Sequence, residues 1–294
     1  MYDYDTIKVE IFDEIAVVKF NRPKVLNALN AKMTGEIADL FDELAVDDNV
    51  RGIIVTGEGR AFMAGSDLTE MKDRDAEAGW KFAQFTNYAF SKVSDIDKPT
   101  LCAINGFALG GGLEFSLCCD WRIASENAVI AAPEVGLGII PCGGGTQRLP
   151  RLIGSGRAKE LIFTGRKINA EEAERIGIIN KVVSSESLMD EALRSMNEVI
   201  ENSSTALKYV KQAIDTGLDM DLNNGLKAEI NAAGMAFASD DKIEYDGRLY
   251  SLSAFTANFL PEEKQNTSGA YQGPKYFSYN GKVLSELRKE KEQH

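Results

Sequence analysis

Two acidic residues stand out because they lie in otherwise uncharged, glycine-rich stretches of the sequence. Glu114 closely follows the triplet Gly110-Gly111-Gly112, and Glu134 lies within the run 131–137. If the two carboxyl groups meet in a cleft, different surroundings separate their proton affinities, which suits acid–base catalysis. The alternatives are structural: Glu114 as a first-turn residue favoured by the helix dipole, and Glu134 as an ordinary surface-loop residue.

The histidine content limits which kinds of catalytic and metal-binding site the chain can form. The only histidine is His294, the last residue. A serine or cysteine triad with a histidine base is therefore excluded, as are histidine-rich zinc sites, and we expect no metal. In an enzyme, proton transfer would have to come from carboxylates, lysine, tyrosine or cysteine.

The backbone of the glycine triplet could bind a ligand. Consecutive glycines let the backbone approach a ligand closely. If a helix begins here, its first N–H groups lack partners within the helix and can donate to a developing oxyanion. Tight packing of the helix on a strand is the alternative explanation. The pattern is not Gly-x-Gly-x-x-Gly, so a dinucleotide-binding fold is not indicated.

Composition excludes several other classes. The chain has 294 residues, 44% of them hydrophobic, and a net charge of −12, which disfavours nucleic-acid binding through basic phosphate contacts. The four cysteines form no Cys-x-x-Cys pair and predict small buried residues in a reducing compartment. The acidic start lacks the features of a signal peptide, and the apolar run 101–121 contains Asn105 and Glu114, which are costly in lipid. We expect a cytoplasmic protein with no nucleic-acid or membrane partner.

Strand and helix patterns alternate through the first two-thirds of the chain, which predicts an α/β layer architecture. Helices are expected over 30–45 and 78–93 and from the glycine triplet onward. A hairpin is expected over 7–20, and further strands at 52–57, 100–104, 122–124, 128–131 and 179–183. After a boundary near Ser203, helices predominate.

Three glycine-containing loops begin at Arg60, Asn105 and Pro133. Their order along the chain resembles the enoyl-CoA hydratase/isomerase (crotonase) family. The resemblance covers about residues 5 to 240. The matching segments are Asn21-Arg22-Pro23 with Asn27-Ala28-Leu29, Ala61-Phe62 with Ala64-Gly65 and Asp67, Asn105-Gly106 through Gly112 with Glu114, Cys119-Asp120, Pro133-Glu134 with Gly138, Pro141, Gly143 to Leu149, Thr164-Gly165, and Ala170 with Ala173.

The resemblance implies a crotonase-like spiral of repeated β–β–α units, followed by a helical C-terminal region that forms trimers. The implied division is 1–202 for the spiral core with the active site, 203–260 for the oligomerisation helices and 261–294 for an extension of unknown role. The implied assembly is a homotrimer or a hexamer built from two trimers.

The resemblance also assigns roles within the site. The substrate would be an acyl-CoA thioester, whose carbonyl oxygen would accept hydrogen bonds from the backbone N–H groups of Met63 and Gly111. Glu114 would orient and deprotonate a water, and Glu134 would supply a proton to the α-carbon. No cofactor is implied beyond the coenzyme A of the substrate. Contacts with the substrate are expected from Ala64, Gly65, Ser66, Asp67, Gly110, Pro133 and Gly138, and contacts with the coenzyme A moiety from Lys24, Val25, Ala28 and Ala61.

The presence of both glutamates favours an enoyl-CoA hydratase acting on a short or medium trans-2-enoyl-CoA. A dehydratase, isomerase or lyase acting on a branched or functionalised acyl-CoA is an alternative, as is a non-catalytic acyl-CoA-binding member. The sequence departs from the family pattern after Asp246-Gly247, where an extension replaces the usual basic pair. Phosphate contacts from that region are therefore not expected.

Overall fold

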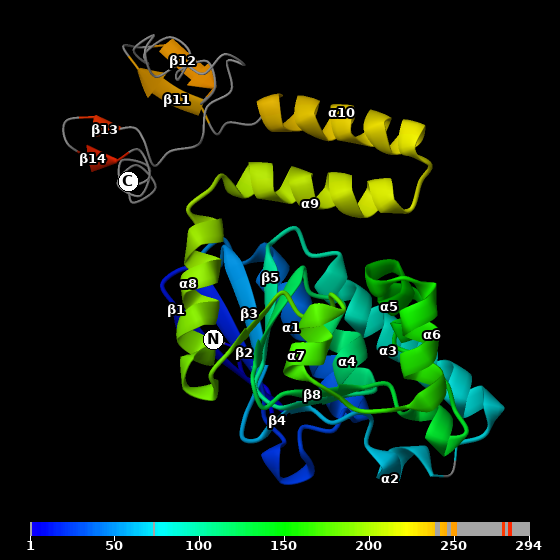
Figure 1. Ribbon diagram of the computed structural model, residues 1–294. Coiled ribbons are helices and arrows are strands. Elements are labelled where there is room, and N and C mark those ends of the chain that lie inside the picture. The colour runs from blue at the N-terminus through cyan, green and yellow to red at the C-terminus, as the bar shows by residue number, and fades with distance from the viewer. Residues whose placement is uncertain are drawn as a thin grey trace. The chain divides into compact units, whose positions relative to one another are not determined.

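The computed structural model describes residues 2–72 and 74–238, and the backbone of four short strands at 242–245, 248–251, 278–279 and 282–283 (Figure 1). The chain divides into two compact units, Met1–Asn197 and Glu198–His294. Helix α8 (Leu188–Ile200) runs across this division.

The larger sheet of the first unit has six strands in the order β1-β2-β3-β5-β7-β10. The predicted hairpin is confirmed, because β1 and β2 pair antiparallel, whereas all later neighbours pair parallel. The central strand β3 is buried along its whole length, as its apolar run predicts. The strands are β1 (Ile7–Phe12), β2 (Ile15–Phe20), β3 (Gly52–Gly57), β5 (Thr100–Ile104), β7 (Trp121–Ser125) and β10 (Lys181–Val183).

A second sheet of four strands has the order β4-β6-β8-β9. Its first three strands pair parallel, and the last pairs antiparallel to β8. The sequence predicts loops where β4 and β6 lie, because their apolar residues are flanked by glycines and show no alternation that would mark a strand. The strands are β4 (Ala61–Met63), β6 (Phe107–Leu109), β8 (Val129–Ala131) and β9 (Ile168–Asn169).

Successive strands alternate between the two sheets, and this alternation produces the spiral. β3, β5 and β7 lie in the larger sheet, and each is followed directly by its neighbour β4, β6 or β8 in the smaller one. A helical segment then leads to the next unit, so the predicted β–β–α spiral is confirmed. Because β4, β6 and β8 are parallel, their carboxyl ends lie at one edge of the smaller sheet, where three loops begin.

The helices of the first unit follow the apolar periodicity of the sequence. In α1 (Ala31–Val46) the Asn30 side chain caps the helix by accepting from the Met33 N–H at 3.0 Å, and the apolar face is buried. The remaining helices are α2 (Leu68–Met71), α3 (Ala76–Ser94), α4 (Gly111–Ser116), α5 (Gly145–Ile153), α6 (Ser155–Thr164) and α7 (Ala170–Arg175), with 3-10 turns η1 (Pro23–Val25), η2 (Glu134–Leu137) and η3 (Ser185–Ser187).

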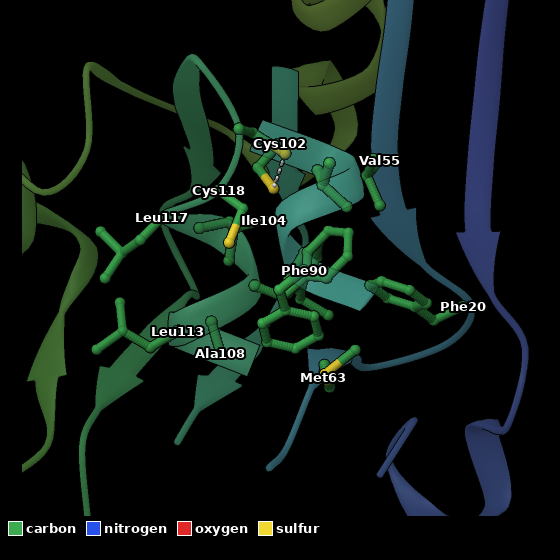
Figure 2. Packing of buried hydrophobic residues seen from close by; sticks show 14 of the residues in the cluster. Phe20, Val55, Met63, Phe90, Cys102, Ile104, Ala108, Leu113, Leu117 and Cys118 are labelled. Atoms are coloured by element: carbon green, nitrogen blue, oxygen red, sulfur yellow. Dashed lines mark hydrogen bonds between the residues drawn. The ribbon is translucent and has the colours of Figure 1, made fainter. Parts of the chain in front are cut away.

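An aromatic cluster in the core fixes the position of α4 (Figure 2). The ring of Phe115 makes edge contacts with Phe20 and Phe90, at centroid distances of 4.9 and 5.3 Å. Since Phe115 directly follows Glu114, the packing of this ring also fixes the backbone that carries the acid.

Three cysteines, Cys102, Cys118 and Cys119, are buried as predicted, whereas Cys142 is only half-buried.

The second unit begins with two helices that pack along each other, α9 (Ser204–Leu218) and α10 (Leu222–Ala238). The Ser203 hydroxyl caps α9 by accepting from the Ala206 N–H at 3.1 Å. The short strands β11 (Lys242–Tyr245) and β12 (Arg248–Ser251) pair antiparallel, as do β13 (Ser278–Tyr279) and β14 (Lys282–Val283). Most of the predicted extension at 261–294 lies outside the described residues.

Candidate active site

The loops that follow β4, β6 and β8 meet at the edge of the smaller sheet. A Cβ built on Gly65 would lie 3.3 Å from the carbonyl oxygen of Leu109, at the end of β6. A Cβ built on Gly110, whose φ is +50°, would lie 2.9 Å from Oε1 of Glu134. Glycine at these positions therefore permits backbone and carboxyl groups from three loops to approach closely.

Glu114 is a buried acid held by backbone amides. It lies in the first turn of α4 and is 5% exposed. Its Oε1 accepts hydrogen bonds from the N–H groups of Gly143 and Gly145, both at 2.8 Å. Burial raises the pKa of Glu114 to about 7, the N–H of Gly145 opposes the rise, and the negative charge of Glu134 adds to it. The two carboxyl groups are thus within electrostatic range.

Glu134 differs from Glu114 in its hydrogen bonding. It opens η2 and is 8% exposed. Its Oε2 is buried and has no hydrogen-bond partner among the described residues. Burial raises the pKa of Glu134, so this side chain holds a proton more readily than an exposed glutamate. Glu114 is thus held by two backbone amides, whereas Glu134 has a buried carboxylate oxygen without a hydrogen-bond partner among the described residues.

The residues that hold Glu114 lie in the motif segment Gly143 to Leu149, which the sequence alone does not connect to this acid. The Arg148 guanidinium donates to the Gly143 carbonyl at 3.4 Å and to the Ser94 hydroxyl of α3 at 3.3 Å. The Asn87 side chain of α3 donates to the Cys142 carbonyl. A Cβ on Gly145 would lie 2.9 Å from Oε1 of Glu114, which explains glycine here. The run Gly143-Gly144-Gly145 was the available signal, but its partner is 29 or more residues away in sequence.

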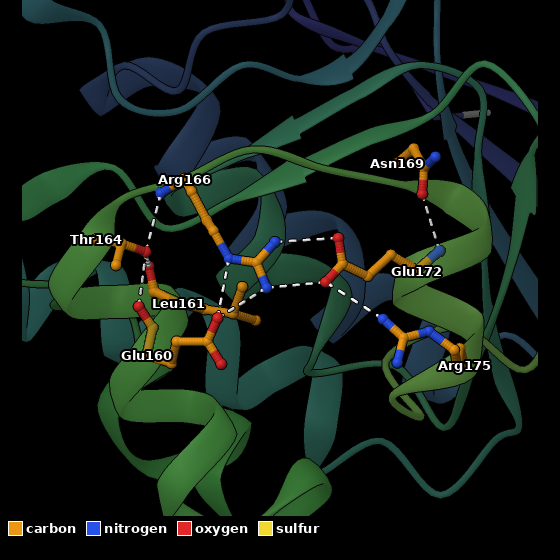
Figure 3. Close-up of polar contacts among 7 residues, drawn as sticks. All are labelled: Glu160, Leu161, Thr164, Arg166, Asn169, Glu172 and Arg175. Carbon is orange, nitrogen blue, oxygen red and sulfur yellow. Dashed lines mark hydrogen bonds and ion pairs between the residues drawn. The ribbon is translucent and has the colours of Figure 1, made fainter.

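The backbone of Glu134 is supported by the turn after α6. Gly165, with φ +58°, ends α6, and its Cβ would lie 3.3 Å from the Cα of Pro133. Arg166 contacts both carboxylate oxygens of Glu172, at 2.8 and 3.0 Å, and Oε1 of Glu160, at 3.0 Å (Figure 3). These ion pairs join the end of α6 to the start of α7, and so hold the turn that packs against Pro133.

The two backbone groups expected to form the oxyanion hole belong to adjacent segments. Gly111 is the first residue of α4, so its N–H has no acceptor within the helix. Met63 ends β4, and a Cβ on Gly112 would lie only 1.9 Å from the Met63 carbonyl oxygen. The start of α4 therefore packs directly against the backbone of Met63. A Cβ on Gly111 would lie 3.7 Å from the Ser66 hydroxyl.

The expected coenzyme A residues lie beside the first of these loops. Leu29 pairs with Ser66, and the Ala64 N–H donates to the Leu26 carbonyl at 3.0 Å. Ala28 lies between these contacts and is half-buried, whereas Lys24 and Val25 precede them and are exposed. Ala61 is buried. Backbone contacts therefore join the segment 24–29 to the loop after β4.

The Asn27 side chain adds further links between the segment 24–29 and the backbone around β4. It is fully buried, with φ +56°. Its Nδ2 donates to the carbonyls of Ala61 at 2.8 Å and Glu58 at 3.0 Å, and its Oδ1 accepts from the Arg22 N–H at 2.8 Å. The Asn27-Ala28-Leu29 motif was the signal for this residue, but its long-range partners could not be read from the sequence.

Two of the expected substrate contacts serve the fold. The Asp67 carboxylate pairs with the Arg22 guanidinium at 3.0 Å and caps α2 through the Thr69 N–H at 3.2 Å. The Thr69 hydroxyl, which donates to Oδ1 at 2.7 Å, is the main cause of the lowered pKa of Asp67, and Arg22 and the Thr69 N–H add to it. Gly138 is exposed and ends η2 in a left-handed conformation, with φ +75°. Both residues shape the loops in which they lie.

The described part of the chain holds no group of three or more His, Cys, Asp or Glu side chains arranged to bind a metal ion. Within the same residues, no helix combines the length and apolar character that crossing a membrane requires.

Comparisons with known proteins agree with this geometry. The family model for enoyl-CoA hydratase/isomerase matches residues 10–256. A short-chain-enoyl-CoA hydratase from Clostridium acetobutylicum is 44% identical, over 82% of this chain and 92% of its own length. A crotonyl-CoA hydratase from Syntrophomonas wolfei is 41% identical, over 87% and 98%.

Solved structures give the same result. An enoyl-CoA hydratase from Bacillus anthracis aligns with a TM-score of 0.78 at 38% identity, over 81% of this chain and 93% of that one. A Geobacillus kaustophilus enoyl-CoA hydratase subunit aligns with a TM-score of 0.78 at 36% identity, over 83% and 99%. The chain therefore belongs to the enoyl-CoA hydratase/isomerase (crotonase) family and is an enzyme of its hydratase branch.

Proposed function

We propose that this enzyme adds water across the 2,3 double bond of a short or medium trans-2-enoyl-CoA, using Glu114 and Glu134 as an acid–base pair. The observation that carries the proposal is two buried carboxyl groups within electrostatic range of each other. Glu114 is fixed by two amides, and Glu134 has a buried oxygen without a described partner. Relatives named as short-chain-enoyl-CoA and crotonyl-CoA hydratases support this substrate class.

The reaction would use the two acids in opposite roles. A pKa of about 7 lets Glu114 accept a proton at neutral pH. The water oxygen bonds to C3 and its proton passes to Glu114, while the electron pair of the double bond moves toward the thioester oxygen. Glu134 would then supply the proton that forms the C2–H bond, and its burial, which raises its pKa, favours the protonated form that this step needs.

The charge that develops on the thioester oxygen would be stabilised by the backbone N–H groups of Met63 and Gly111. Backbone donors suit this role because they cannot ionise and need no reorganisation during the reaction. Coenzyme A would pass along the 24–29 segment near Ala61. The reaction needs no redox cofactor or metal, because every proton moves between water, carboxyl groups and substrate.

The test is crotonyl-CoA hydration by Glu114→Gln and Glu134→Gln. Each variant should lose about 100-fold or more in kcat, the usual contribution of one general acid or base. The control is Glu126→Gln, which alters an exposed glutamate on the turn after β7 and should leave turnover unchanged. Near-normal turnover by either active-site variant, with the fold intact by circular dichroism, would remove this mechanism.

The proposal also covers the oligomeric state of the enzyme. We infer a homotrimer or hexamer with a cytoplasmic location, in which residues 203–260 supply the oligomer contacts. The support is a set of exposed apolar side chains on α9 and α10, which are Val210, Ile214, Leu218, Leu222, Leu226, Ile230 and Met235. Light scattering after size-exclusion chromatography tests the stoichiometry, and a monomer at micromolar concentration would refute it.

A further inference from the structure

The two amides that hold Glu114 are themselves held in different ways. The N–H of Gly145 lies in the first turn of α5, and the Gly144 carbonyl of the same peptide group accepts from the Arg148 N–H at 2.8 Å. Backbone hydrogen bonding of the helix therefore fixes this amide. The N–H of Gly143 lies two residues before α5, so the orientation of its peptide group depends on other contacts.

The side chain of Asn87 on α3 supplies such a contact. Its Nδ2 donates to the Cys142 carbonyl, which belongs to the same peptide group as the Gly143 N–H. Among the described residues, Asn87 is the only hydrogen-bond donor to this carbonyl. Because a peptide group is planar, a donor bound to its oxygen also fixes the direction of its N–H. The donor polarises the group as well, which strengthens the hydrogen bond to Glu114.

Packing places α3 directly against this peptide group. A Cβ built on Gly143 would lie 3.0 Å from the Phe90 ring and 3.0 Å from Oε2 of Glu114. Phe90 lies three residues after Asn87, so α3 reaches the loop through both an aromatic contact and a hydrogen bond. Asn87 is exposed, whereas Phe90 is fully buried. The core is therefore filled by the ring, and the amide of Asn87 contributes its hydrogen bond.

We propose that Asn87 is a positioning residue, which acts through the Cys142–Gly143 peptide group to hold the carboxylate of Glu114 in place as the base. This inference rests on the proposed function, in which Glu114 accepts the proton of water. Hydrogen bonds to a charged acceptor are stronger than those to a neutral one. Loss of the Asn87 amide should therefore weaken the support of the ionised carboxylate more than that of the neutral carboxyl group, and make ionisation of Glu114 less favourable.

The test is Asn87→Leu, which keeps the branched shape of the side chain but cannot donate. The ionisation constant of Glu114 should fall about threefold. The kcat/KM for crotonyl-CoA should then be about threefold below wild type at pH 6, where ionised Glu114 is scarce, and approach wild type at pH 9, where it predominates. The matched control is Gln84→Leu, which replaces an exposed amide one turn earlier on α3 and should follow wild type at every pH.

The other titratable groups around Glu114 are the same in wild type and variant. The charges of Glu134 on η2 and Arg148 on α5 act on the pKa of Glu114 in both enzymes. Burial raises the pKa of the Cys118 thiol to about 12 and that of Cys142 to about 11, so both stay neutral between pH 6 and 9. A displaced pH profile in Asn87→Leu therefore reports the lost hydrogen bond.

Two results with Asn87→Leu would overturn the inference. A loss of the same size from pH 6 to pH 9 would assign Asn87 to the fold alone, and a wild-type profile would show that its amide is not needed. Asn87→Asp is a second variant in case the first does not fold, because its carboxylate keeps the shape and can only accept; a wild-type profile there would also count against the inference. Failure of the proposed function is recognised separately, since Glu114→Gln would then hydrate crotonyl-CoA at a near-normal rate.

Discussion

The buried acid Glu114 should reduce stability in the pH range where the enzyme works. Folding raises its pKa from 4.5 to about 7. Each unit corresponds to about 1.4 kcal/mol, so the ionised side chain should lower the free energy of unfolding by about 3 kcal/mol above pH 7. Glu114→Gln stays neutral at every pH, and its amide oxygen can still accept from Gly143 and Gly145. This variant should therefore be inactive yet more stable than wild type at pH 8.

The direction of the pKa shift determines how the free energy of unfolding changes with pH. The folded pKa lies above the unfolded one, so folding favours the protonated form of Glu114. The contribution to stability is fully present below pH 4.5, declines between 4.5 and 7, and is lost above the folded pKa of about 7. The difference between Glu114→Gln and wild type should consequently grow over this window and then level off.

Urea unfolding followed by tryptophan fluorescence, at one protein concentration and several pH values between 5 and 8.5, measures this difference. The fixed concentration matters because an oligomer links stability to mass action. Glu126→Gln, at an exposed position, serves as the control and should track wild type. If the stability of Glu114→Gln ran parallel to that of wild type across the whole range, folding would not raise the pKa of Glu114.

Three further outcomes are expected. Asn27→Ala removes a buried side chain that bonds four backbone groups, so the free energy of unfolding in urea should fall by about 2–4 kcal/mol; a loss below 1 kcal/mol would contradict its organising role. Gly110→Ala would place a Cβ 2.9 Å from Oε1 of Glu134, so kcat for crotonyl-CoA should fall about tenfold or more while KM changes little; unchanged kcat would show that Glu134 tolerates displacement. The kcat/KM for crotonyl-CoA should rise with pH through about 7 as Glu114 ionises, and a flat profile from pH 5 to 9 would argue against Glu114 as the base.

Much of the fold could be predicted because its signals are local. The hairpin of β1 and β2, the central strands and helix α1 each follow from the periodicity of apolar residues and from capping or turn residues. The strands β4 and β6 are not predicted, because each is a short apolar run inside a glycine-containing segment, and parallel pairing with distant segments makes them strands. Their absence from the prediction matters, since these strands begin the loops of the site.

The sequence by itself determined which groups are available: a chain whose only histidine is the last residue, two glutamates in apolar loops, and glycines where side chains would collide. Only the tertiary structure decided what those groups meet. The amides that hold Glu114 and the turn that supports Pro133 come from separate segments. The pKa of an acid depends on burial and on neighbouring charges in space, and these are set only when the two sheets and their helices pack.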